Sequence, residues 1–194
     1  MSKLIETLTK EEKSKLKIVE VKKDETLFFE DEQCKFVGLI IKGRIQIVSF
    51  LEDGREVVYN DLTSGEMFGN NLIFSSQQTY RGDVIAKENT TLYLISKEEL
   101  LDIFKTNEKF LEAYLFMQAE SGKQMNLRIK LLTFINAKDR FLYYLQINHS
   151  KLTYKTIADL ARTLYLSREV LSRLIHSLEK DGVIYIRGKT IIKS

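Results

Sequence analysis

The first half of the chain shows the hydrophobic pattern of strands. Between residues 18 and 95, short runs rich in β-branched and aromatic side chains are separated by turn signals, which is typical of antiparallel β-structure. Gly43, Gly54 and Gly65 recur at intervals of eleven residues, where the backbone is expected to turn through positive φ. The pattern predicts an antiparallel roll or sandwich.

Helix signals stand on both sides of this strand-rich stretch. The segment Thr9–Glu12 has the sequence of a capping box and predicts a short helix to about Lys17, with Leu16 on its buried side. A second capping box at Ser96–Glu99 predicts another helix directly after the last strand.

A much longer helical pattern runs from about Lys109 to Phe134. One set of positions in it alternates steps of four and three and forms a heptad seam: Leu111, Leu115, Gln118, Gly122, Met125, Ile129 and Leu132. The seam favours a parallel coiled coil with a second copy, in which Gln118 and Gly122 fix the register or permit close approach. The alternative is packing of this stripe against the strands of the same chain. Both can hold, because a second apolar face is formed by Phe110, Tyr114, Phe116 and Met117.

The last third of the chain has the pattern of a winged helix-turn-helix. A helix is expected from Lys138 to Ile147, and Asn136-Ala137 before it is the expected hinge. Two further helices open at Thr156 and at Ser167, and the second ends at Asp181-Gly182. Their apolar positions are Leu160, Ala161, Leu164, Val170, Leu171, Leu174, Ile175 and Leu178. Two strands around Gly188-Lys189 predict the wing.

Side chains suited to DNA lie opposite the apolar stripe of the second helix. They are Arg168, Glu169, Ser172 and Arg173, which can reach base edges and phosphates in a major groove. The charge distribution agrees: the net charge of +3 divides into +5 from Ser150 onward and −2 before it. The alternative for the charge alone is an ordinary solvated face.

Composition excludes other classes. Apolar runs are too short to cross a bilayer and the start of the chain lacks a secretory core, so we expect a cytoplasmic protein without a membrane partner. The single cysteine, Cys34, excludes an intrachain disulfide, and its acidic neighbours predict no lowered thiol pKa. His149 and His176 lie outside the strands, which argues against a metal or haem site. No catalytic constellation is recognisable, and we expect neither enzyme nor cofactor.

These motifs together resemble the CRP/FNR family of bacterial regulators, along nearly the whole chain. The residues that carry the resemblance are the glycine-punctuated strands, Ser167–Arg173 and the wing at Ile186–Ile191. The resemblance implies an α+β fold with a cyclic-nucleotide-binding-type β-roll (residues 1–108), a dimerisation helix (109–135) and a winged helix-turn-helix (136–194). It also implies a homodimer, double-stranded DNA as partner, and RNA polymerase as a further partner.

The family's base-reading positions correspond to Glu169, Ser172 and Arg173, and Arg168 matches an arginine that some members use on guanine. The predicted phosphate contacts are Thr156, Ser167, His176 and Lys189. We expect half-sites of the TGTGA or TTGAT kind, about one helical turn apart. For Glu169 the alternative is a purely local role at the positive end of its helix. Tyr165 departs from the family, since many relatives have glycine in that turn.

The effector region departs further. Gly65–Gly69 resembles the start of the family's phosphate-binding cassette, but Asn70 replaces its glutamate, and Tyr80 and Arg81 stand where relatives have arginine and serine. An offset of one residue would turn Arg81 away from the pocket. The adenine-contacting positions correspond to Met125 and Asn126. These departures argue against cAMP and leave the effector open.

The alternative to a regulator is a protein of another class, a stand-alone ligand-binding signalling module that acts on a partner protein and uses the C-terminal helices for protein contact. An absent or acidic recognition helix would mark such a module, whereas this chain has a basic one.

Overall fold

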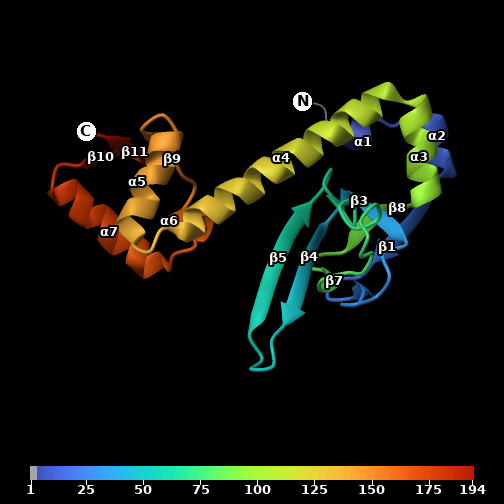
Figure 1. Cartoon of the computed structure of the whole chain (residues 1–194), viewed down its shortest axis with the longest axis horizontal. Helices are drawn as coiled ribbons and strands as arrows, with labels where there is room; N and C mark the ends of the chain where they lie inside the picture. The colour runs from blue at the N-terminus through green and yellow to red at the C-terminus, as the bar shows by residue number, and fades with distance from the viewer. Residues whose placement is uncertain (1–3) are drawn as a thin grey trace. The chain divides into compact units, whose positions relative to one another are not determined.

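The computed structural model describes residues 4–194 (Figure 1). They divide into two compact units, one ending at Gln118 and the other beginning at Ala119. The long helix α4 (Glu108–Thr133) therefore contributes to both units. Each unit encloses its own hydrophobic core. The fold is mixed, with antiparallel sheets and helices, which confirms the predicted α+β class.

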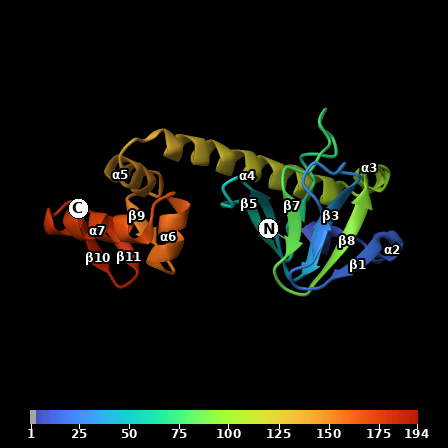
Figure 2. The ribbon, with the colours of Figure 1, turned by 90° about the horizontal axis from the view of Figure 1, so that it is seen from below.

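The strands of the first unit form two antiparallel four-stranded sheets, in the orders β1-β8-β3-β6 and β2-β7-β4-β5 (Figure 2). Their bounds are β1 (Lys17–Val21), β2 (Thr26–Phe28), β3 (Phe36–Lys42), β4 (Arg44–Phe50), β5 (Glu56–Thr63), β6 (Met67–Phe68), β7 (Asp83–Ala86) and β8 (Thr90–Ser96). The inner pair β3 and β8 places Val37 opposite Ile95 and Leu39 opposite Tyr93. Because these side chains are buried, the pair fixes the register of the roll.

The glycines predicted at turns do adopt positive φ, at +101° for Gly43, +79° for Gly54 and +91° for Gly65. A fourth glycine serves close packing instead. A Cβ at Gly38 would lie 2.0 Å from the ring of Phe68, so that ring can cross the strand only over a glycine.

In the first unit, two short helices precede the first strand and one helix follows the last strand. They are α1 (Leu4–Thr7), α2 (Lys10–Lys15) and α3 (Lys97–Thr106). The capping boxes at Thr9 and Ser96 are both present, and Leu16 is buried as expected. The first prediction was slightly too long, because α2 ends at Lys15 and residue 17 already begins β1.

The amino-terminal half of α4 packs on the core of the roll through one of its faces. Phe110, Tyr114 and Met117 take part in that packing, whereas Phe116 is exposed. The predicted second apolar face is thus confirmed for three of its four residues and wrong for Phe116.

The second unit comprises the rest of α4 followed by α5 (Ala137–Ile147), β9 (Lys151–Thr153), α6 (Ile157–Thr163), α7 (Arg168–Lys180), β10 (Ile184–Arg187) and β11 (Thr190–Lys193). The predicted helices and the two wing strands are confirmed. Strand β9 was not predicted. It pairs with β11 and extends the wing to a three-stranded sheet of order β10-β11-β9.

Candidate nucleic-acid interface and effector region

The turn between α6 and α7 determines where the second helix starts. Tyr165 has φ +54°, a left-handed conformation that glycine adopts most easily and that aromatic residues rarely take. This explains why relatives can place glycine here. The Leu166 amide donates to the Ala161 carbonyl at 2.9 Å. The Ser167 hydroxyl then accepts from the Val170 amide at 3.2 Å and caps α7.

Helix α7 is strongly two-sided. Leu171, Ile175 and Leu178 are buried in the core of the second unit. The predicted base-reading residues are all exposed on the opposite side: Arg168, Glu169, Ser172 and Arg173. Their spacing of one and four residues puts them on one helix face. The structure therefore brings the four together as a polar surface over a rigid apolar base.

Glu169 belongs to this surface and also to the helix start. Its pKa is lowered, first because its carboxylate accepts a hydrogen bond from its own backbone amide and from Ser167, and further because Arg168 and Arg173 lie nearby. Glu169 is therefore ionised at neutral pH and remains an acceptor. Glu169 therefore does interact with the amino-terminal end of α7, the local role given above as the alternative, and its carboxylate also stays exposed to solvent.

The predicted phosphate contacts, Thr156, Ser167, His176 and Lys189, are exposed as well. Thr156 and Ser167 are the N-caps of α6 and α7, and the positive ends of helices favour anions. Lys189 lies in the turn between β10 and β11, after Gly188 at φ +58°. The Lys189 carbonyl accepts from the Tyr154 amide at 3.0 Å, so the segment after β9, which sequence reasoning missed, holds the wing tip.

The predicted effector residues of the first unit have different fates. The side-chain amide of Asn70 donates to Gln118 Oε1 at 2.6 Å. Tyr80 is only 1 % exposed; its ring stacks on Phe28 at 4.8 Å between centroids, and its hydroxyl donates to the Phe36 carbonyl at 3.1 Å. Arg81 is exposed. The polar groups of Asn70 and Tyr80 are therefore already hydrogen-bonded within the chain.

Two further features bear on the effector region. At Gly69, φ is +76°, and a Cβ would lie 2.9 Å from the Phe36 carbonyl oxygen, so the turn approaches β3 too closely for another residue. Met125 and Asn126 belong to the second unit, where both are exposed on α4.

Cys34 lies beside Tyr80 in the interior of the roll. Its thiol donates weakly to the Phe36 carbonyl at 3.4 Å. Burial raises the pKa of the Cys34 thiol, and burial also raises the pKa of Tyr80 far above its usual range. The expectation of no lowered thiol pKa is confirmed, although the dominant cause is burial rather than acidic neighbours.

The predicted seam on α4 is mostly exposed. Leu115, Met125 and Ile129 have exposed fractions of 57 %, 61 % and 57 %, and Leu132 and Gly122 are exposed too. Within the first unit, the intrachain alternative of packing on the roll therefore fails at Leu115. Gln118 differs from them, since its amide bonds to Asn70 and, at 3.4 Å, to the Tyr114 hydroxyl.

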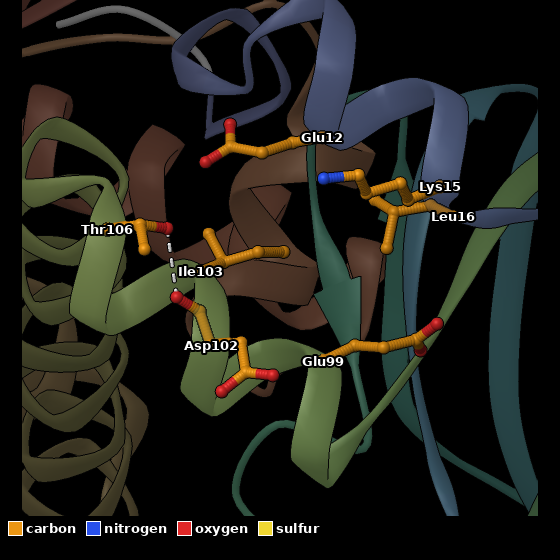
Figure 3. A pocket seen from close by; sticks show the side chains of 7 residues that line it. All are labelled: Glu12, Lys15, Leu16, Glu99, Asp102, Ile103 and Thr106. Carbon is orange, nitrogen blue, oxygen red and sulfur yellow. Dashed lines mark hydrogen bonds between the residues drawn. The ribbon is translucent and has the colours of Figure 1, made fainter.

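A hollow of about 260 Å³ lies between α2 and α3 (Figure 3). Its lining consists of Glu12, Lys15, Leu16, Glu99, Asp102, Ile103 and Thr106. The carboxylates are already engaged: Glu12 and Glu99 close the two capping boxes, and Asp102 pairs with Lys105 at 2.9 Å. Across residues 4–194, no cluster of histidine, cysteine and acidic residues could hold a metal ion.

The described residues thus form a β-roll, a long helix with an exposed apolar stripe and a winged helix-turn-helix, the architecture that the sequence resemblance implied. Comparison with known proteins agrees. Residues 18–107 match the cyclic nucleotide-binding domain family. The cAMP-activated global transcriptional regulator Vfr of Pseudomonas aeruginosa is 25 % identical over 180 residues, which cover 86 % of this chain and 84 % of Vfr. The CRP-like protein Clp of Xanthomonas oryzae is 26 % identical over 168 residues, 79 % of this chain and 73 % of Clp.

The fold is also that of a solved structure, the catabolite activator protein of Thermus thermophilus. The TM-score is 0.59 at 21 % identity, with 100 % of this chain and 94 % of the other covered. Most of the chain is therefore similar in sequence to CRP-like transcription regulators, and the likeness in fold agrees. Within residues 4–194, no helix is both long and apolar enough to span a bilayer.

Proposed function

We propose that the chain acts as a homodimer that reads a palindromic DNA site with helix α7. The observation that carries the proposal is the exposed polar face of α7 over its buried apolar face. A helix fixed in this way can enter a major groove with its amino-terminal residues against the base edges. The surplus of positive charge from Ser150 onward supplies attraction to phosphate.

The reading chemistry follows from the four exposed residues. Arg168 and Arg173 can each donate two hydrogen bonds to guanine O6 and N7, and ionised Glu169 can accept from cytosine N4. Thr156, Ser167, His176 and Lys189 would position the helix by contacts to phosphate. These residue types suit half-sites of the TGTGA or TTGAT kind, separated by about one helical turn.

Dimerisation through α4 is supported by the exposure of its seam. Leu111, Leu115, Gly122, Met125, Ile129 and Leu132 are proposed to meet their copies. Leu127 and Leu131 pack into the core of the second unit instead, so the same helix can serve a core with one face and a partner with the other. Gln118 is shared between the seam and its bond to Asn70.

The relative Vfr is described as cAMP-activated, and we propose that this chain is not. Tyr80 fills the interior where a bound phosphate would need a cation, and Asn70 is tied to Gln118. Ligand at 100 times its Kd stabilises a protein by about 2.7 kcal/mol. We expect cAMP to leave thermal unfolding of the first unit unchanged; a concentration-dependent rise in Tm would contradict this.

DNA binding can be tested without knowing the target genes. Selection from a pool of random duplexes should enrich an inverted repeat, and titration of that duplex at several salt concentrations should show steep salt dependence. Weak binding without sequence preference would instead support a module that signals to a protein partner. A regulator of this kind would work with RNA polymerase, at DNA in the cytoplasm.

A further inference from the structure

Arg140 on α5 connects two chain segments through backbone carbonyls. Its Nη2 donates to the Phe134 carbonyl at 2.8 Å, directly after the end of α4. Its Nη1 donates to the Leu164 and Tyr165 carbonyls, at 3.1 and 3.0 Å, where α6 ends and the turn begins. One guanidinium therefore spans the end of α4 and the turn that precedes α7.

The physical reason for an arginine here is the chemistry of helix ends. The last carbonyls of a helix lack intrahelical donors and carry partial negative charge. A planar guanidinium can satisfy several of them at fixed angles, which the point charge of a lysine cannot do. Arg140 is half-buried, and its Nε is buried without a hydrogen-bond partner. The bonds from Nη1 and Nη2 to carbonyls therefore supply the polar contacts that a partly desolvated cation needs.

The same turn is held from a second point on α4. The guanidinium carbon of Arg128 lies 5.2 Å from the centre of the Tyr165 ring, within the range of a cation–π contact. Tyr165 is the residue with φ +54°, a conformation that persists only when its surroundings hold it. Arg140 on the carbonyl side and Arg128 on the ring side supply those surroundings. Two residues later Ser167 caps α7.

We propose that Arg140 is a positioning residue for DNA recognition: it locks the α6–α7 turn to the end of α4 and so sets the start of the recognition helix relative to the dimerisation helix. The proposal rests on the proposed function, because it assumes that α4 forms the dimer and α7 reads DNA. Two recognition helices must fit successive grooves together. A loosened turn would therefore lower selective binding, although Arg140 itself need not touch DNA.

The test compares Arg140→Gln and Arg140→Lys with Lys138→Gln, which removes a charge from an exposed position of the same helix. Amide hydrogen exchange at residues 164–167 is measured on the free proteins. Affinities for the selected duplex and for an unrelated duplex are measured at one salt concentration. Arg140→Gln should speed exchange in the turn and lower the ratio of the two affinities by about tenfold, a modest part of the 10³- to 10⁷-fold gap between specific and non-specific binding. Lys138→Gln should leave both unchanged.

Arg140→Lys decides between geometry and charge. We expect it to fold, to keep the non-specific affinity, and to lose part of the selectivity because it cannot bridge all three carbonyls. If Arg140→Lys shows the amide exchange and the selectivity of the wild-type protein, the proposal is overturned. This outcome is decisive even if Arg140→Gln fails to fold. If the wild-type protein shows no sequence preference for DNA, the proposed function fails. Amide exchange in the α6–α7 turn is still informative in that case: faster exchange in Arg140→Gln than in the wild-type protein means that Arg140 holds the turn, and equal exchange means that it does not.

Discussion

The region around Tyr80 and the exposed face of α7 differ in where their polar groups find hydrogen-bond partners. In the roll, the hydroxyl of Tyr80 and the amide of Asn70 bond to the chain itself. On α7, the side chains of Arg168 and Ser172 are exposed and make no hydrogen bond within residues 4–194. Groups satisfied internally support a fold, whereas groups left to solvent can exchange water for a ligand. The comparison shows that Tyr80 belongs to the core of the roll, whereas the polar side chains of α7 are free to meet the DNA proposed for them.

The strongest way to break the DNA-reading side of this comparison is to separate the two copies. The double variant Ile129→Glu with Leu132→Glu places charges in the exposed seam and should yield a monomer by sedimentation. Losing the second recognition helix should reduce affinity for the inverted repeat by about 10²- to 10⁴-fold, the usual gain from linked binding.

Gln124→Glu is the matched control, because residue 124 is exposed on α4 away from the seam. It should remain dimeric and bind normally. A double variant that stays dimeric would mean that α4 is not the interface.

The roll side of the comparison is tested at Tyr80. Truncating a fully buried aromatic ring costs about 3–5 kcal/mol, so Tyr80→Ala should lower the free energy of unfolding of the first unit by that amount. Tyr80→Phe removes only the hydrogen bond to Phe36 and should cost about 1 kcal/mol. Chemical denaturation measures both. Were Tyr80 a pocket residue awaiting a ligand, Tyr80→Ala would be tolerated with little loss.

Local signals made much of this molecule predictable. The capping boxes at Thr9 and Ser96, the turn at Gly54 and the cap at Ser167 depend on residues close in sequence, and each is present. The four residues of α7 that we propose to read DNA follow from helical periodicity and form one exposed face. These features could be read from the sequence because neighbouring residues determine them.

Contacts between distant segments were not predictable in this way. Strand β9 exists because Leu152 pairs with Ile191, a partner nearly forty residues away, and its own three residues give little signal. The bond between Gln118 and Asn70, 48 residues distant, could not be predicted from the heptad pattern of α4. Arg140 had no sequence signature, since its partners are backbone carbonyls that any residue provides.

The base-reading assignment is sharpened by Arg173. Arg173→Ala should weaken the free energy of binding to the selected duplex by about 1–3 kcal/mol. It should also relax the preference at one base position per half-site. The measurement is competition with duplexes substituted at each position in turn. An unchanged position profile would remove Arg173 from the reading face, even if the overall affinity fell.

Lys189 in the wing should give the smallest effect and one of a different kind. Because a phosphate contact carries no sequence information, Lys189→Ala should weaken selected and unrelated duplexes alike. One lost phosphate contact should also reduce the slope of log affinity against log salt by about 0.9. Lys193→Ala is the matched control, because Lys193 is an exposed lysine at the end of β11 and does not lie in the turn between β10 and β11. A change in base preference caused by Lys189→Ala would place the wing among the reading elements, and the distinction between positioning and reading residues would have to be redrawn.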